Sequence, residues 1–183
     1  MSLKQEGLIQ CYTGNGKGKT TSAIGVVLRS LAVNKKVAII AFDKGGNSHY
    51  SERLIFQKKF PELDFYPTGL DRIDPQTGRF RMGITQEDKQ EGQRGLTILQ
   101  KLFQKDEYDL IILDEINSST DLGIVDKDFV LKILKNKPSK TEIILTGRNA
   151  PQEFIDLADL VTEMCLKKHY FYQGVSARAG IDY

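Results

Sequence analysis

The chain has 183 residues, of which 40% are hydrophobic, and no long Pro/Gly/Ser tract interrupts it. This length and composition predict one globular domain over residues 1–183. The net charge of +2, from 26 basic and 24 acidic residues, excludes the general basic field of a non-specific nucleic-acid binder. We expect no membrane partner, because no apolar run could span a bilayer and no signal pattern opens the chain. The two cysteines lie in no CxxC motif or Cys/His cluster, which favours reduced thiols in a cytoplasmic protein.

The first predicted element is a short apolar run, residues 8–12, which reads as a buried strand and leads into a glycine-rich loop. A helical pattern follows from Thr20 to about Val33. This order of strand, loop and helix is the context of a phosphate-binding loop. The glycines permit a nest of inward-facing amide groups at the positive end of the helix. We therefore predict that the phosphates of a nucleotide bind to Gly14, Asn15, Gly16, Lys17, Gly18, Lys19, Thr20 and Thr21.

Two residues of this loop have particular predicted roles. Lys19 is placed to reach the outer phosphates, and the Thr20 hydroxyl to bind a magnesium ion. The usual pattern begins with a glycine where this chain has Thr13, and the glycine comes one place late, at Gly14. The alternative is a glycine-rich hairpin or flexible turn, which the flanking strand and helix disfavour.

Strands and helices continue to alternate along the chain. The nearly continuous apolar run 36–42 predicts a strand covered by helices on both faces, and it ends in the loop 43–46. Residues 51–60 can form a short helix, and residues 63–66 a short strand. This alternation predicts an α/β fold, a three-layer α/β/α domain around a mainly parallel sheet, of the P-loop NTPase (RecA-like) class. The order of the strands cannot be read from the sequence.

The longest irregular segment, residues 67–84, predicts a functional flap loop, with a disordered region as the alternative. Thr85 then has the features of a helix N-cap, with Asp88 three places on.

The second informative run, residues 110–115, has four branched apolar residues followed by Asp114 and Glu115. These acids should emerge at the carboxyl end of a buried strand, where ligands bind in open parallel sheets. The run resembles the acidic strand that supports magnesium in P-loop nucleotide hydrolases, and we assign magnesium to Thr20 and Glu115. The alternative is a solvated turn. We expect the chain to continue into a loop at Ile116 and Asn117, and a helix over residues 127–135.

A fifth strand, residues 141–146, delivers Arg148 to the same edge, where it could contact a phosphate or form an ordinary surface ion pair. A helix through residue 158 and a last strand, residues 160–164, precede an aromatic-rich tail, residues 165–183. Its aromatic residues 170–172 could cover a planar ligand or close the core. The only histidines, His49 and His169, read better as surface or capping residues than as a metal or catalytic pair.

Several runs together resemble one family, the P-loop type of ATP:corrinoid adenosyltransferase, which makes adenosylcobalamin. The late glycine in the phosphate loop is this family's own form, and the match to Thr-Gly-Arg-Asn-Ala-Pro is highly specific. The similarity extends over almost the full chain and lies in residues 12–21, 42–45, 113–117, 145–151, 158–164, 168–169, 174–175 and 180–183.

The resemblance implies transfer of an adenosyl group rather than of phosphate. In this family a cobalt(I) corrinoid attacks the C5′ carbon of MgATP and expels triphosphate, so charge builds on the leaving group. The predicted catalytic residues are Lys19, Thr20 and Glu115, with Mg²⁺ as cofactor and ATP and a reduced corrinoid as substrates. The resemblance also suggests a homodimer and an electron-donating reductase as partner.

Two features depart from the family's pattern. The family's Phe-Thr-Trp run in the flap has Phe80-Arg81-Met82 as its best match here, and the chain has no tryptophan. We carry over Phe80 alone as a corrinoid contact. Few residues precede the first strand, where some members have a helix that closes over the corrinoid. Two alternatives therefore stay open: a P-loop nucleotide hydrolase or small kinase, and a non-catalytic corrinoid or nucleotide carrier.

Overall fold

The computed structural model describes residues 6–45, 51–72, 76 and 81–182. A six-stranded sheet forms its centre, and every strand pairing in it is parallel. The order across the sheet is β3-β2-β4-β5-β1-β6. The strands are β1 (Ile9–Thr13), β2 (Val37–Ala41), β3 (Asp64–Pro67), β4 (Leu110–Asp114), β5 (Glu142–Thr146) and β6 (Leu160–Glu163).

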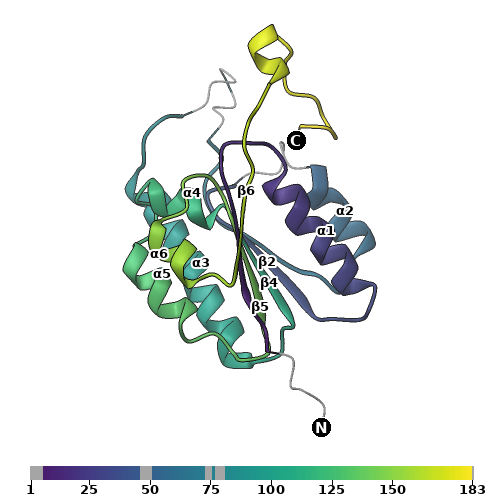
Figure 1. Ribbon diagram of the computed structural model, residues 1–183, viewed down its shortest axis with the longest axis vertical. Coiled ribbons are helices and arrows are strands. Elements are labelled where there is room, and N and C mark those ends of the chain that lie inside the picture. Colours follow the sequence, from purple (N-terminus) through teal and green to yellow (C-terminus); the bar gives the residue numbers. More distant parts are fainter. Residues whose placement is uncertain (1–5, 46–50, 73–75, 77–80, 183) are drawn as a thin grey trace.

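Helices cover both faces of this sheet (Figure 1). On one face lie α1 (Lys19–Leu31) and α2 (Ser51–Lys59); on the other lie α3 (Gln86–Lys105), α4 (Ile116–Asp121), α5 (Lys127–Leu134) and α6 (Gln152–Leu157). The three-layer architecture predicted from the alternation of elements is therefore confirmed, and the sheet is parallel throughout the described strands.

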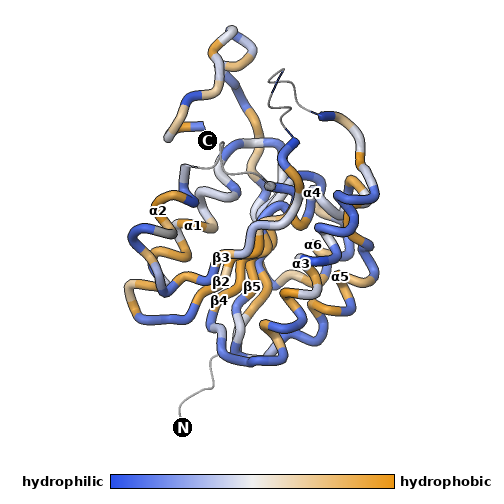
Figure 2. Tube along the Cα trace, turned by 180° about the vertical axis from the view of Figure 1, so that it is seen from behind, coloured by the Kyte–Doolittle hydropathy of each residue, from blue (hydrophilic) through white to orange (hydrophobic). Residues whose placement is uncertain are grey.

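Successive residues of a strand point to opposite faces of the sheet, and this produces two separate hydrophobic cores. Ile39 and Ile112 join the cluster with α1 and α2, whereas Ala38 and Ile111 join the cluster with the other helices. Because side chains of successive strand residues point to opposite faces, a strand buried on both sides must be apolar at every position. Figure 2 shows the strands as the most hydrophobic part of the chain.

Local sequence signals set the helix starts. Thr85 and Asp88 form the predicted capping box of α3: the Thr85 side chain accepts from the Asp88 N–H, and the Asp88 carboxylate accepts from the Thr85 N–H at 2.7 Å. Asp126 caps α5 through the N–H of Phe129.

The expected loop after Glu115 was wrong, because α4 begins directly at Ile116. Glu115 is its N-cap and adopts a left-handed conformation, with φ of 61°. Ile116 is fully buried against the core, so packing stabilises a six-residue helix whose polar sequence has little intrinsic helix propensity.

Two arginines anchor the base of the flap, Arg81 to α3 and Arg72 to the loop after β2. Arg81 donates to both oxygens of Asp88, at 3.0 and 2.7 Å, and Arg72 donates to Asp43 at 2.7 Å. The Asp88 side chain has no exposed surface. Residues 73–75 and 77–80 of the predicted flap loop lie outside the described residues, so the structure describes the two ends of this loop.

After β6 the tail runs past the phosphate loop to a 3₁₀ helix, Tyr170–Gln173, and then turns back toward α1 and α2 (Figure 1). Within the described ranges, no helix combines the length and apolarity needed to cross a membrane.

Candidate active site

The loop between β1 and α1 packs closely against the backbone of Met164, directly after β6. Gly14 has φ of 91°, and a Cβ atom there would lie 2.5 Å from the carbonyl oxygen of Met164. A Cβ atom on Gly16 would lie 2.6 Å from the same oxygen, which accepts a hydrogen bond from the Gly16 N–H. Thr13, where the usual pattern has its first glycine, is the last residue of β1 and pairs with Glu163. Gly14 is therefore the first residue after the strand.

Lys19, at the start of α1, is directed into this loop. Its ammonium donates to the carbonyl oxygens of Gly14 at 2.7 Å and Gly16 at 2.8 Å. Burial lowers the pKa of Lys19. An ammonium has three N–H donors, so these two contacts leave one donor for a phosphate oxygen.

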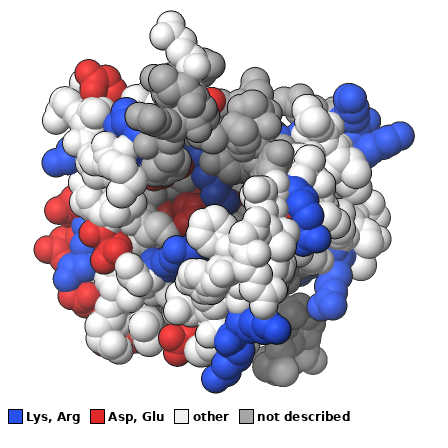
Figure 3. Space-filling model, turned by 90° about the horizontal axis from the view of Figure 1, so that it is seen from above, with Lys and Arg blue, Asp and Glu red and all other residues white. Residues whose placement is uncertain are grey.

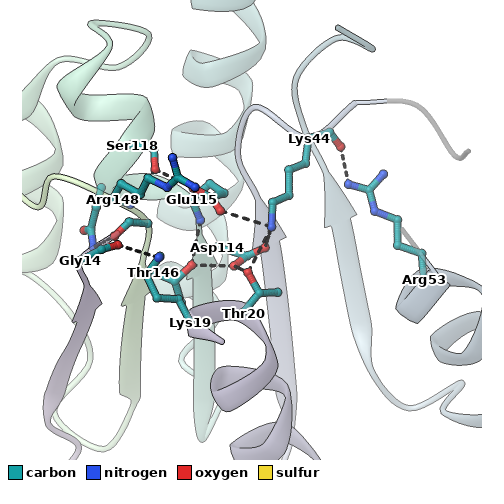
Figure 4. Close-up of polar contacts among 12 residues, drawn as sticks. Gly14, Lys19, Thr20, Lys44, Arg53, Asp114, Glu115, Ser118, Thr146 and Arg148 are labelled. Carbon is teal, nitrogen blue, oxygen red and sulfur yellow. Dashed lines mark hydrogen bonds and ion pairs between the residues drawn. The ribbon is translucent and has the colours of Figure 1, made fainter. Parts of the chain in front are cut away.

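Asp114, at the end of β4, is the centre of a buried polar network (Figure 4). Its Oδ1 accepts from the hydroxyls of Thr20 at 2.9 Å and Thr146 at 2.6 Å, and its Oδ2 accepts from the Lys44 ammonium at 2.5 Å. Burial alone would raise the pKa of Asp114, but the Lys44 charge and these hydroxyls hold it below its usual value. The carboxylate therefore stays ionised although the residue is only 4% exposed.

Lys44 and Thr146 were not among the predicted site residues. Lys44 follows β2, and its ammonium also donates to the Thr20 hydroxyl at 3.2 Å and lies 3.6 Å from Glu115 Oε1. Thr146 ends β5, the strand between β4 and β1, and accepts from the Glu115 N–H at 3.0 Å. Both residues lie at the carboxyl ends of predicted strands, and this position is the signal by which the sequence could have identified them as site residues.

Glu115 and Arg148, which the sequence placed at the same edge, both line the cleft. The Glu115 carboxylate accepts a hydrogen bond from the Ser118 hydroxyl at 2.6 Å. The hydroxyl oxygen of Ser118 in turn accepts one from the backbone N–H of Arg148 at 2.9 Å. A Cβ atom on Gly147 would lie 2.7 Å from the Ser118 N, so glycine is needed for this close approach. Figure 4 shows the Arg148 side chain extended toward Glu115.

The tail holds the outer part of the phosphate loop. The Lys17 ammonium forms an ion pair with Asp182 and donates to the carbonyl of Ile181 at 2.7 Å. The Asn15 side chain accepts from the Leu166 N–H at 2.9 Å. Thr21, in the first turn of α1, is exposed and lines the cleft.

The predicted phosphate-loop residues from Asn15 onward share one cleft of about 1220 Å³ with Lys44, Glu115 and Arg148. Its outer wall comes from the tail and includes His169, Tyr170, Phe171 and Tyr172. Phe171 and Tyr172 are 66% and 77% exposed, so this cluster does not close the core. His169 caps the 3₁₀ helix through the Phe171 N–H, as the capping interpretation predicted. Figure 3 shows acidic and basic side chains together in the hollow on this face.

The remaining predicted contact, Phe80, lies outside the described residues. The neighbouring Arg81 is held by Asp88, and Met82 is 83% exposed.

These elements define a class of protein. A parallel α/β sheet, a glycine-rich loop before α1 and an acid at the end of a buried strand are the parts of a P-loop nucleotide-binding domain. Solved structures of this class share the fold: the RadB recombinase superimposes with a TM-score of 0.52 at 18% identity, covering 89% of this chain and 77% of that one. This similarity confirms the RecA-like fold, and it is evidence for the fold alone.

The chain belongs to the ATP:corrinoid adenosyltransferase family BtuR/CobO/CobP, whose profile matches residues 5–183. Proteins named corrinoid adenosyltransferase are similar over nearly the whole chain. The one from Sinorhizobium sp is 34% identical over 181 residues, covering 98% of this chain and 81% of that protein. Those from Pseudomonas aeruginosa and Escherichia coli K12 are each 32% identical over 179 residues, covering 98% of this chain and 85% and 87% of the relatives. The family resemblance seen in the sequence motifs is thereby confirmed.

Proposed function

We propose that this chain, as a member of that family, transfers the 5′-deoxyadenosyl group of MgATP to the cobalt(I) of a corrinoid and releases triphosphate. A cobalt–carbon bond forms to C5′ as the bond from C5′ to the triphosphate oxygen breaks, and the bonding electrons leave with triphosphate. The observation that carries the proposal is the family match over residues 5–183, on a chain whose phosphate loop opens into one large cleft.

In this proposal the leaving group lies in the phosphate loop. Lys19 offers its third N–H donor, and the first turn of α1 adds amide donors at the positive end of the helix. Arg148 lines the same cleft, where a guanidinium can pair with a phosphate. The nucleophile is the corrinoid's own cobalt, so the protein needs no general base, and positioning and electrostatics supply catalysis.

The donors at the inner end of the cleft fit magnesium. Thr20, Asp114 and Glu115 present a hydroxyl and two carboxylates, the oxygen ligands that Mg²⁺ prefers, and the Lys44 ammonium shows that a cation is stable among them. We assign the metal to Thr20 and Glu115, with Asp114 orienting Thr20. Among the described residues no group of three or more His, Cys, Asp or Glu side chains could hold a metal. This suits Mg²⁺, which uses few protein ligands beside phosphates. When bound, magnesium would neutralise charge on the triphosphate.

The corrinoid would enter from the outer, aromatic side of the cleft, where Phe171 and Tyr172 expose apolar surface for a planar macrocycle. We also propose Phe80 as a contact. Because cobalt must be reduced to cobalt(I), an electron-donating reductase is a proposed partner. Both cysteines are free thiols, which suits the reducing cytoplasm.

A second copy of the chain is a further proposed partner. The edge strand β6 exposes Leu160 and Val161, at 46% and 41%, and an exposed edge strand is a surface for association. Light scattering of the purified chain should give the mass of a dimer; the mass of a monomer at micromolar concentration would contradict it.

The test is an anaerobic assay of the purified chain with MgATP and chemically reduced cob(I)alamin, in which the corrinoid spectrum and the phosphate products are followed together. We expect adenosylcobalamin and triphosphate in equal amounts over many turnovers. Formation of ADP alone would support the hydrolase or kinase alternative, and one turnover or none would support a carrier.

The Glu115→Gln variant tests the metal assignment in the same assay. The amide is a weaker ligand, so the magnesium concentration for half-maximal rate should rise about tenfold. Glu107→Gln, on the surface, is the matched control. An unchanged magnesium response in Glu115→Gln would assign the metal to another ligand.

A further inference from the structure

The ammonium of Lys44 lies among the same oxygen atoms that the magnesium proposal requires. Its Nζ is 2.5 Å from Asp114 Oδ2, 3.2 Å from Thr20 Oγ1 and 3.6 Å from Glu115 Oε1. The Lys44 side chain is 14% exposed, and those of Asp114 and Glu115 are 6% and 26% exposed. One positive charge therefore already offsets part of the charge of this partly buried acidic pair.

The directions of the hydrogen bonds show that Lys44 and a metal ion would compete for the oxygen atom of Thr20. The Thr20 hydroxyl donates its hydrogen to Asp114 Oδ1, and its oxygen accepts from Lys44. The hydroxyl oxygen has two lone pairs, and the Lys44 N–H uses one of the two that a metal ion could use. A divalent cation and an ammonium in contact with the same three groups would repel each other strongly.

The backbone that carries Lys44 is fixed. Its N–H donates to the carbonyl of Thr68 at 3.1 Å, and its own carbonyl accepts from the Arg53 guanidinium. A Cβ atom on Gly45 would collide with the backbone at Leu70, so the next residue is tightly packed as well. Displacement of the ammonium therefore has to be a rotation of the side chain.

Two hollows adjoin Lys44 among the residues that the structure describes. A small cavity of about 20 Å³ beside Lys44 has room for about one water molecule, and its lining combines apolar side chains such as Phe56 with the charged residues Glu52 and Arg53. A cavity of this size has no room for the end of the Lys44 side chain. Lys44 also lines the large cleft that the phosphate loop opens into, where a triphosphate would provide negative charge.

We propose that Lys44 is a resident cation of the metal site: its ammonium holds the three oxygen donors until MgATP displaces it onto the triphosphate. Divalent metal then binds to this chain only together with the nucleotide. Lys44 acts twice, first as the counter-ion of Asp114 and then as a contact to the leaving group. The inference rests on the proposed magnesium site and is independent of the corrinoid chemistry.

The test uses Mn²⁺ as a paramagnetic probe, with bound ion measured by electron paramagnetic resonance on the full chain. Without nucleotide, wild type should bind Mn²⁺ weakly, and the neutral variants Lys44→Met and Lys44→Gln should bind it at least about tenfold more tightly. With a non-hydrolysable ATP analogue, wild type should bind Mn²⁺ tightly. Lys44→Arg, which retains the charge, should behave as wild type does. Lys36→Met removes a surface ion pair with Glu107 and is the matched control.

Thermal unfolding provides a second readout, because a metal bound only to the folded state raises its melting temperature. Mn²⁺ alone should stabilise Lys44→Met and leave wild type unchanged. If the neutral variants do not fold, the nucleotide dependence of Mn²⁺ binding by wild type carries the test.

Two results would overturn the inference and leave the proposed function standing: tight Mn²⁺ binding by wild type without nucleotide, or equal Mn²⁺ affinity of wild type and Lys44→Met. Absence of Mn²⁺ binding by every variant even with the ATP analogue would overturn the magnesium site, and the inference with it.

Discussion

The inner and outer walls of the cleft are built in different ways. The inner wall consists of strand ends and the first turn of α1, and its polar groups are buried and hydrogen-bonded to one another, as in the network around Asp114. The outer wall is the tail, whose residues 171–180 are all exposed. Ion pairs at the surface, chiefly those of Asp182 with Lys17 and Arg178, hold it in place.

The difference separates two tasks. Groups that must stabilise charge at a fixed point need a rigid, partly desolvated setting, which the strand ends provide. A surface that admits a large ligand must open and close, and surface ion pairs are weak enough to allow it. Substitutions in the inner wall should therefore change the rate, and those in the outer wall should change the order of the tail.

The largest expected effect is that of Lys19→Ala, in the inner wall. Loss of the ammonium removes a donor to the leaving group, and we expect turnover to fall by at least about 100-fold, or about 3 kcal/mol in the barrier. The anaerobic adenosylation assay measures it, with Lys36→Ala as the surface-lysine control. Turnover near that of wild type would remove Lys19 from the mechanism.

Asp88→Asn tests the anchor between the flap and α3, and its effect should be intermediate. The Arg81 guanidinium and the Thr85 N–H hold the pKa of Asp88 at about 2, against 3.8 for an ordinary aspartate. The folded state therefore favours the ionised carboxylate, and its contribution to stability is complete above about pH 5 and lost as the pH falls toward 2. We expect the variant to lose about 2 kcal/mol of unfolding free energy at neutral pH.

Urea denaturation at a series of pH values measures this loss. The difference between wild type and Asp88→Asn should be constant above pH 5 and shrink between about pH 4 and pH 2. Asp106→Asn, at the exposed end of α3, is the control and should change little. A difference that does not depend on pH would show that the ion pairs of Asp88 do not stabilise the fold.

Asp182→Ala, in the outer wall, should have the smallest effect on the whole molecule. It removes the partner of Lys17, Arg178 and Tyr170, so amide hydrogen exchange should quicken in residues 165–182 and stay unchanged in β4 and α1. We expect no measurable change in melting temperature, because exposed ion pairs contribute little. Unaltered protection of the tail would mean that packing, rather than charge, holds it.

The inner wall was largely predictable from the sequence. Glycine spacing, the position of Lys19 and the acids after an apolar run are local signals, and each element that carries them was expected within one or two residues of its observed bounds. Among the α-helices of the described residues, α4 was missed; it has six residues, and its stability comes from the burial of Ile116 rather than from its own sequence. Periodicity cannot reveal such an element.

The contacts between distant segments were not predictable. Lys44 reaches Asp114 because β2 and β4 are neighbours in the sheet. No local pattern in the sequence predicts the order of the strands. The same holds for Asp182 and Lys17, 165 positions apart in the chain. The roles of Lys19, Thr20, Glu115, Arg148 and Phe80 remain predictions that the experiments above address.

The place of β5 between β1 and β4 also sets a length. Neighbouring strands lie about 4.8 Å apart, so the strand that leads to the phosphate loop and the strand that ends in acids are separated by about 10 Å. The first turn of α1 closes this interval, because the Thr20 hydroxyl donates to Asp114 Oδ1 at 2.9 Å. Thr146, at the end of the intervening strand, donates to the same oxygen at 2.6 Å. The strand order thus fixes the position of Asp114 relative to the phosphate loop without the help of a ligand.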